Sequence, residues 1–296
     1  MKKIIVITGP TGVGKTKLSI ALAHHFNGEI INADSMQVYK DLNIGTAKIS
    51  EEEKEGIPHY LFDEKDVLDY YSVYDYQNDG RELLNNFDDS KTPIIVGGTG
   101  LYIKALLYDY KFPNDEVQYD FSHLTNKEIY DNIKKYTDDI DIHINNRQRL
   151  ERRLNMCMNK KDNKTLKGNE LLYDVVFIGL TTDRDKLYDI INNRVDKMIA
   201  AGLIDEVKSL YNKGIRSKAI ATGIGYKELY KYFDGELSLE EAIDLIKKNS
   251  RHYAKRQYTW FNNQMDITWF NVNFDNFSKT KKEVISYIEK SYELDS

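Results

Sequence analysis

The fold is decided near the start of the chain, by the stretch Lys3-Ile4-Ile5-Val6-Ile7-Thr8-Gly9-Pro10-Thr11-Gly12-Val13-Gly14-Lys15-Thr16. Its first six residues form a short apolar, β-branched run that predicts a buried strand. Its last eight fit the pattern G-x-x-x-x-G-K-[ST], and helical spacing follows, with Leu18, Leu22 and Phe26 at i, i+4 and i+8. Strand, glycine loop and helix in this order predict a phosphate-binding loop, or P-loop.

The residues of this loop suit a di- or triphosphate. Glycines let backbone N–H groups turn toward phosphate oxygens, and the helix N-terminus adds a favourable dipole. We expect Lys15 to neutralise the terminal phosphate and the Thr16 hydroxyl to bind Mg²⁺ as a cofactor. The same motif is common in ATP-binding proteins. The expected diphosphate-binding residues are Gly9, Pro10, Thr11, Gly12, Val13, Gly14, Lys15 and Thr16.

Four further β-rich runs cover residues 29–33, 93–96, 175–180 and 267–270. The first three lie far enough from their predecessors for helices between them, which is typical of a parallel sheet covered on both faces. Helical spacing also marks residues 185–212, interrupted by Gly202, and residues 239–262.

Residues 112–173 carry no strand signal, and they change from acidic to basic along a polar, helix-like stretch. We therefore predict an α/β fold. A P-loop NTPase-like core, with a parallel β-sheet flanked by helices, comprises residues 1–111 and 174–296. A mostly helical insertion domain occupies residues 112–173.

The composition excludes several classes of protein. The 296 residues hold a single cysteine, Cys157, so no internal disulfide can form, and a reducing cytoplasm is the expected location. One cysteine and six histidines show no zinc-site spacing. No apolar run approaches the roughly 20 residues that span a bilayer, so we expect no membrane association. We expect a monomer.

Asp34 is the candidate general base. It follows the second predicted strand, and strand carboxyl ends line the ligand crevice of an open α/β sheet. A helix or turn cap, or a group that helps to hold a metal ion, remains an alternative role. Thr99, after the third strand, is expected to hydrogen-bond Asp34 or the acceptor. That strand ends in Gly97-Gly98-Thr99-Gly100, without the carboxylate typical of nucleotide hydrolases.

The chain resembles a known family, the tRNA dimethylallyltransferases, which are isopentenyltransferases that modify the adenosine next to the anticodon. The matching motifs cover nearly the whole chain in the family's order: Gly9-Pro10-Thr11 through Lys15-Thr16, Asp34-Ser35-Met36-Gln37-Val38-Tyr39-Lys40, Ile44-Gly45-Thr46-Ala47-Lys48, Val96-Gly97-Gly98-Thr99-Gly100-Leu101-Tyr102, Gln148-Arg149-Leu150, Gly225-Tyr226-Lys227-Glu228 and Ala254-Lys255-Arg256-Gln257-x-Thr259-Trp260.

The resemblance implies transfer of a dimethylallyl group from dimethylallyl diphosphate to the adenine N6 of the tRNA anticodon stem-loop. In such enzymes an arginine on the helix after the fourth strand contacts the diphosphate, a place that Arg194 takes here. The implied catalytic set is Asp34, Lys15, Thr16, Thr99 and Arg194. The chain departs from the family at Ile190, where another basic residue is common, and at Asn146, where aspartate is usual. It has no C-terminal zinc module, so it resembles the bacterial type.

Two basic segments are candidates for RNA contact, although the net charge is −5. Arginines crowd residues 147–153, and Lys247, Arg251 and Lys255 recur at i, i+4 and i+8 on the late helix, in a stretch without acids. The predicted tRNA-binding residues are Asp34, Ser35, Met36, Gln37, Thr99, Gln148, Arg149, Leu150, Lys247, Arg251 and Lys255.

Three other functions remain open at this stage. A P-loop kinase of small metabolites has a similar core, and a close relative would prenylate free adenine nucleotides. A non-catalytic RNA-binding switch gated by ATP or GTP is the third. The long insertion and the basic segments favour tRNA prenylation over the first two. The third would require that bound ATP or GTP alter the affinity for RNA.

Overall fold

The computed structural model describes residues 3–112, 119–159 and 168–293, in two compact units. Unit 1 comprises residues 1–107 and 171–296, and unit 2 comprises residues 108–170. Unit 2 therefore begins and ends a few residues before the predicted insertion domain of residues 112–173.

Unit 1 is built on a six-stranded sheet with the order β3-β2-β4-β1-β5-β6, and all its pairs are parallel. The strands are β1 (Lys3–Thr8), β2 (Gly28–Asn32), β3 (His59–Tyr60), β4 (Thr92–Val96), β5 (Asp174–Thr181) and β6 (Thr268–Asn271). The five predicted strands are confirmed, and β3 was missed. It has two residues and no apolar run, so its pairing with Ile30 and Ile31 left no signal in the sequence.

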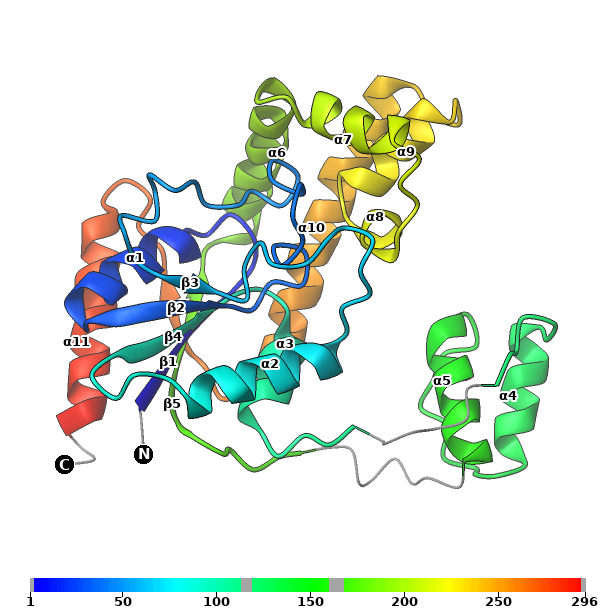
Figure 1. The fold of residues 1–296 in the computed structure, drawn as a ribbon, viewed down its shortest axis with the longest axis horizontal. Coiled ribbons are helices and arrows are strands. Elements are labelled where there is room, and N and C mark those ends of the chain that lie inside the picture. The colour runs from blue at the N-terminus through cyan, green and yellow to red at the C-terminus, as the bar shows by residue number, and fades with distance from the viewer. Residues whose placement is uncertain (1–2, 113–118, 160–167, 294–296) are drawn as a thin grey trace. The chain divides into compact units, whose positions relative to one another are not determined.

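Helices cover both faces of this sheet (Figure 1). The helices α1 (Lys15–His25) and α11 (Phe277–Glu293) lie on one face. The helices α2 (Val73–Asn85), α3 (Gly100–Leu107) and α10 (Leu239–Gln264) lie on the other. The strand residues Ile5, Ile7, Ile94 and Ile178 are fully buried between these layers, as a parallel sheet requires. The predicted fold class is confirmed.

A helical layer beyond the strand ends completes unit 1. It contains α6 (Arg184–Ala200), α7 (Leu203–Asn212), α8 (Lys218–Thr222) and α9 (Tyr226–Phe233), with the first half of α10. Gly202 separates α6 from α7 with a φ of 101°, a left-handed conformation that glycine adopts without strain. The interruption predicted at Gly202 therefore divides that segment into two helices.

Unit 2 is a helical hairpin of α4 (Asn126–Lys134) and α5 (Arg147–Met158). Its small core includes Ile129, Ile133, Leu150 and Leu154. Asn146 caps α5 by accepting a hydrogen bond from the Arg149 amide at 3.3 Å, so the loop cap persists with asparagine in place of aspartate.

Candidate active site

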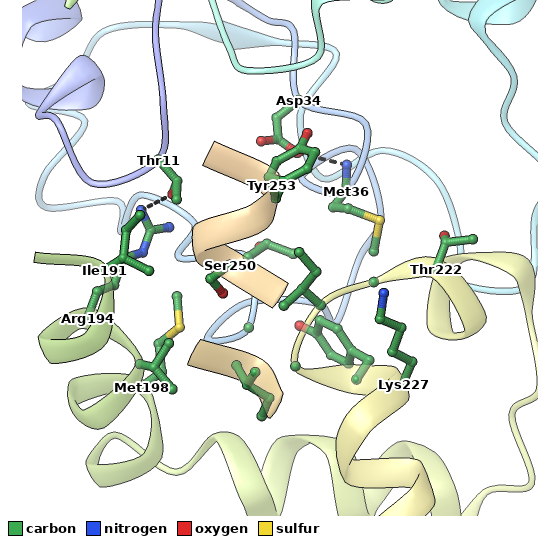
Figure 2. A pocket seen from close by; sticks show the side chains of 18 of the residues that line it. Thr11, Asp34, Met36, Ile191, Arg194, Met198, Thr222, Lys227, Ser250 and Tyr253 are labelled. Carbon is green, nitrogen blue, oxygen red and sulfur yellow. Dashed lines mark hydrogen bonds between the residues drawn. The ribbon is translucent and has the colours of Figure 1, made fainter. Parts of the chain in front are cut away.

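A cavity of about 270 Å³ opens at the carboxyl ends of the strands, between α6, α10 and the loops that follow β1 and β2 (Figure 2). Its polar lining residues include Thr11, Lys15, Asp34, Ser35, Arg194 and Arg256. Its apolar lining residues include Met36, Ile191, Val195, Met198, Leu203 and Ile246. All of these residues belong to unit 1.

The P-loop forms the polar edge of the cavity. Gly9 has a φ of 134°, and a Cβ there would lie 2.4 Å from the Leu180 carbonyl oxygen, so a larger residue would not fit. The Lys15 ammonium donates hydrogen bonds to the carbonyls of Gly9 and Pro10, both at 2.9 Å. Thr16 follows at the exposed start of α1. The loop thus presents one cation and one hydroxyl at the head of a helix.

Arg194 reaches this loop from α6, 183 residues further along the chain. Its Nη1 donates to the Thr11 hydroxyl at 2.5 Å. Burial lowers the pKa of the guanidinium and the carboxylate of Asp34 opposes that change, but an arginine stays charged. The structure therefore brings together Lys15, Arg194 and Asp34, which the sequence predicted for one site.

Lys15 is electrostatically coupled to both of these neighbours. Burial, and to a smaller extent the charge of Arg194, lowers the pKa of the Lys15 ammonium to about 8, while Asp34 acts in the opposite direction. Two cations that face the same space repel each other, and an anion placed between them would relieve the repulsion. This edge of the cavity is therefore suited to a polyanion.

Asp34 lies in a tight turn after β2. Its amide donates to Asn32 Oδ1 at 3.0 Å, and its own Oδ1 accepts the Met36 amide at 2.9 Å. One carboxylate oxygen thus caps the turn while the side chain faces the cavity (Figure 2). The capping role and a catalytic role are compatible, since they use different oxygens.

Thr99 supports this turn. Its hydroxyl accepts the Ser35 amide at 3.1 Å and pairs with the Ser35 hydroxyl at 3.3 Å. Of the two expected partners, Asp34 is replaced by the next residue, Ser35, and a hydrogen bond from Thr99 to the acceptor stays a prediction. Thr99 orients the turn through the backbone.

Two residues of α10 at the site carried no role in the sequence analysis. Gln257 is buried; its Oε1 accepts the Thr11 amide at 3.2 Å and its Nε2 donates to the Gly98 carbonyl at 2.9 Å. Tyr253, one turn earlier, lies beside Asp34 (Figure 2). Burial raises the pKa of its phenol to about 12, so it stays a hydrogen-bond donor at neutral pH. Tyr253 and Gln257 are four residues apart and therefore share one face of α10, opposite the basic residues. This spacing was the signal in the sequence that could have identified them.

Glu206 fixes another part of the cavity wall. Its carboxylate accepts three successive amides, those of Asn43 at 3.1 Å, Ile44 at 2.7 Å and Gly45 at 3.1 Å. It also accepts the Tyr226 hydroxyl at 2.7 Å. A Cβ on Gly45 would lie 2.6 Å from the Tyr226 ring, which explains the glycine at this position. The sequence analysis quoted residues 44–48 as a motif but missed the carboxylate that holds them.

Replacing Glu206 by glutamine is expected to lower the free energy of unfolding by about 1–3 kcal/mol, because an amide offers one acceptor oxygen and sets an N–H₂ group against backbone N–H donors. Urea unfolding of the full chain measures the change. Glu82→Gln, the same substitution on an exposed position of α2, should stay within about 0.5 kcal/mol of the wild type. Equal unfolding midpoints for Glu206→Gln and wild type would contradict this role.

Other predicted site residues lie as follows. Ser35 and Met36 line the cavity. The side-chain amide of Gln37 donates a hydrogen bond from Nε2 to the Thr46 carbonyl at 3.0 Å, so it holds the same segment, residues 43–46, that Glu206 binds. At Gly12, a Cβ would lie 3.0 Å from the Ile190 side chain. At position 190, where the family commonly has a basic residue, this chain therefore places an apolar side chain next to the P-loop.

The basic residues of α10 do not form one solvent-facing stripe. Lys247 pairs with Asp196 of α6 at 2.6 Å, and Arg251 donates to Asn192 of α6 at 2.5 Å. Lys255 is exposed. The expectation that Lys247, Arg251 and Lys255 form one continuous RNA-binding surface is corrected, because Lys247 and Arg251 pack against α6.

In unit 2, Gln148 and Arg149 are exposed and Leu150 is fully buried in the hairpin core. The prediction that Leu150 binds tRNA is therefore corrected, because this residue packs in the core and is not exposed. Arg147 is held inside unit 2, where its guanidinium donates to the carbonyls of Phe121 and Leu124 and to Glu151.

Metal and membrane features are few in the described part of the chain. Across residues 3–112, 119–159 and 168–293, no cluster of three or more His, Cys, Asp or Glu side chains could hold a metal ion. Nor does any helix there combine the length and apolar character needed to span a membrane.

Comparison with known proteins decides the family. The family model described as IPP transferase matches residues 37–264. A tRNA dimethylallyltransferase of Anoxybacillus flavithermus is 49% identical, over 100% of this chain and 99% of its own length. This chain belongs to the tRNA dimethylallyltransferase family.

Solved structures agree with this membership. The tRNA isopentenylpyrophosphate transferase of Bacillus halodurans is 41% identical with a TM-score of 0.75, and the match covers 100% of this chain and 99% of that one. A eukaryotic dimethylallyltransferase described as acting on tRNA is 30% identical with a TM-score of 0.85, over 100% of this chain and 80% of its own. The predicted membership of the tRNA dimethylallyltransferase family, and with it of a class of prenyltransferase enzymes, is confirmed.

Proposed function

We propose that the protein transfers a dimethylallyl group from dimethylallyl diphosphate to N6 of the adenosine next to the anticodon of tRNA, in the cytoplasm. The observation that carries this proposal is a cavity lined by a P-loop lysine, an arginine and a carboxylate together with apolar side chains. Such a lining suits an isoprenoid diphosphate beside a nucleobase. The names of the relatives support the same reaction.

In the proposed reaction the bond between C1 and the diphosphate oxygen breaks, and the leaving group takes the electron pair. Lys15, Arg194 and the loop amides stabilise the charge that develops on it. The adenine N6 forms the new bond to C1. An exocyclic amine is a weak nucleophile because its lone pair is delocalised, so we assign the removal of its proton to the Asp34 oxygen that does not cap the turn.

The Thr16 hydroxyl is the proposed protein ligand of Mg²⁺. A single hydroxyl fits this ion, which commonly takes one or two protein oxygens together with substrate phosphates and waters. When bound, Mg²⁺ would supply further charge neutralisation to the leaving diphosphate.

For the RNA backbone we propose contacts from Gln148 and Arg149 of unit 2 and from Lys255 of unit 1, which are all exposed. The target adenine would leave its stack to enter the cavity. The Tyr253 phenol and the Arg256 guanidinium line the cavity and can donate hydrogen bonds to it.

One assay tests the proposal. The protein is incubated with Mg²⁺ and unmodified tRNA, together with either dimethylallyl diphosphate labelled in the prenyl carbons or γ-labelled ATP. Label should pass from the prenyl donor into tRNA. Phosphoryl transfer from ATP without prenylation would favour a kinase. In a parallel incubation with AMP or ADP in place of tRNA, faster labelling of the nucleotide than of tRNA would favour a prenyltransferase of free nucleotides.

Donor affinity should depend on pH through Lys15. Its lowered pKa of about 8 means that the cation is present below that pH and is lost as pH rises through it. Because the anionic donor binds the cation, its affinity should fall by up to about tenfold per pH unit above 8. Calorimetry of donor binding without RNA at pH 7 and 9 measures this. Lys15→Arg stays charged and should show no such fall, and equal wild-type affinities at both values would refute the assignment.

A further inference from the structure

The cavity of the proposed reaction shares a wall with a second hollow. This hollow measures about 560 Å³ and lies on the other side of the segment around Ile44 and Gly45. Gly45 lines the first cavity and Ile44 the second, while Arg194 and Met198 line both. The partition between the two spaces is therefore one backbone segment and the side chains that meet it from α6.

The second hollow offers apolar surface close to this partition. Its lining includes Ile44, Ala47, Ile49, Phe62 and Ala201, next to charged groups such as Lys197 and Asp63. An apolar chain that passed Met198 would find apolar surface to pack against there.

The α6 face that borders the cavity carries one cation, Arg194, and continues beyond it with apolar side chains. Ile191, Arg194, Val195 and Met198 follow one another at helical spacing on this face (Figure 2). Met198 lies one turn beyond Arg194, about 6 Å along the helix axis. A diphosphate held by Lys15 and Arg194 can therefore lay its hydrocarbon tail along Val195 and end against Met198.

The adenine acceptor does not occupy the space toward Met198, so the hydrocarbon tail of the donor can lie there. In an in-line displacement the attacking nitrogen and the leaving oxygen lie on opposite sides of C1, so the remaining carbons project sideways. Asp34 and Met36 border the acceptor side, and Met198 lies across the cavity from them (Figure 2).

We propose that Met198 determines which prenyl chain length the enzyme accepts, by closing the cavity against the second hollow. The proposal rests on the proposed function. An unbranched, partly buried methionine is suited to this position, because it fills an irregular gap without strain. The rest of the partition should stay in place when this side chain is shortened, since Glu206 fixes the amides of Ile44 and Gly45.

The test compares dimethylallyl diphosphate with geranyl diphosphate, which is one isoprene unit longer, as donors to unmodified tRNA. The measured quantity is the ratio of kcat/KM for geranyl to that for dimethylallyl transfer. Met198→Ala should raise this ratio at least about tenfold over wild type, because pocket volume at this scale changes selectivity by roughly 10–200-fold. Met198→Val, which removes less volume, should give a smaller rise.

Met36→Ala is the matched control, since it shortens a methionine on the opposite wall. Its ratio should stay at the wild-type value. An unchanged ratio in both Met198 variants, with dimethylallyl transfer still measurable, would overturn this inference alone, as would an equal rise in Met36→Ala. If wild type does not transfer dimethylallyl to tRNA, the proposed function itself fails, and this inference with it.

Discussion

Replacing Asp34 by asparagine is expected to lower the rate of prenyl transfer by about two to four orders of magnitude, the usual contribution of a positioned general base. The substitution tests the catalytic role alone because it leaves the turn after β2 intact. An asparagine oxygen can still accept the Met36 amide, as Asp34 Oδ1 does at 2.9 Å. Only the proton acceptor is lost, so the dissociation constants for tRNA and dimethylallyl diphosphate should change little.

Single-turnover kinetics with saturating donor measure this effect apart from product release. Asp41→Asn makes the same chemical change at an exposed position seven residues later and should keep the wild-type rate. A near-normal rate in Asp34→Asn would show that Asp34 serves the turn alone and that another group, or solvent, takes the proton.

The second large effect is expected from Arg194→Ala, which should lower kcat/KM by about 10²–10³-fold, the loss typical of one preorganised donor at a developing charge. The arginine reaches the P-loop through the Thr11 hydroxyl and shares the cavity edge with Lys15. Because it contacts the donor in the ground state as well, KM should rise while kcat falls. Lysine at this position should restore only part of the loss, since it lacks the planar fork.

Arg184→Ala is the control for Arg194. Arg184 is exposed at the first residue of the same helix, where it stacks on Tyr188, and it does not line the cavity. Its kinetics should match wild type. Equal losses in the two variants would mean that α6 charge matters in general, and that Arg194 has no specific place at the leaving group.

The parts of the site that could be read from the sequence are those with strict local requirements. The P-loop needs glycines at fixed positions, and the carboxyl end of a parallel strand places Asp34 at the crevice. Arg194 was placed through the family resemblance, and the structure puts it on Thr11.

The contacts that were missed depend on residues far apart in the chain. Glu206 binds amides some 160 residues earlier, and Gln257 bonds the loop amide of Thr11. Neither pairing produces a local pattern. The basic stripe failed for a related reason: helical spacing places Lys247 and Arg251 on one face of α10 but does not tell that α6 covers it.

The most direct test of the central claim is a crystal structure of the Asp34→Asn variant with dimethylallyl diphosphate and an unmodified anticodon stem-loop, since slow turnover preserves both substrates. The predicted result is a diphosphate within hydrogen-bonding distance of Lys15 and Arg194, with the adenine N6 facing residue 34. A diphosphate bound outside the P-loop, or a nucleobase whose N6 points away from residue 34, would contradict the proposed chemistry.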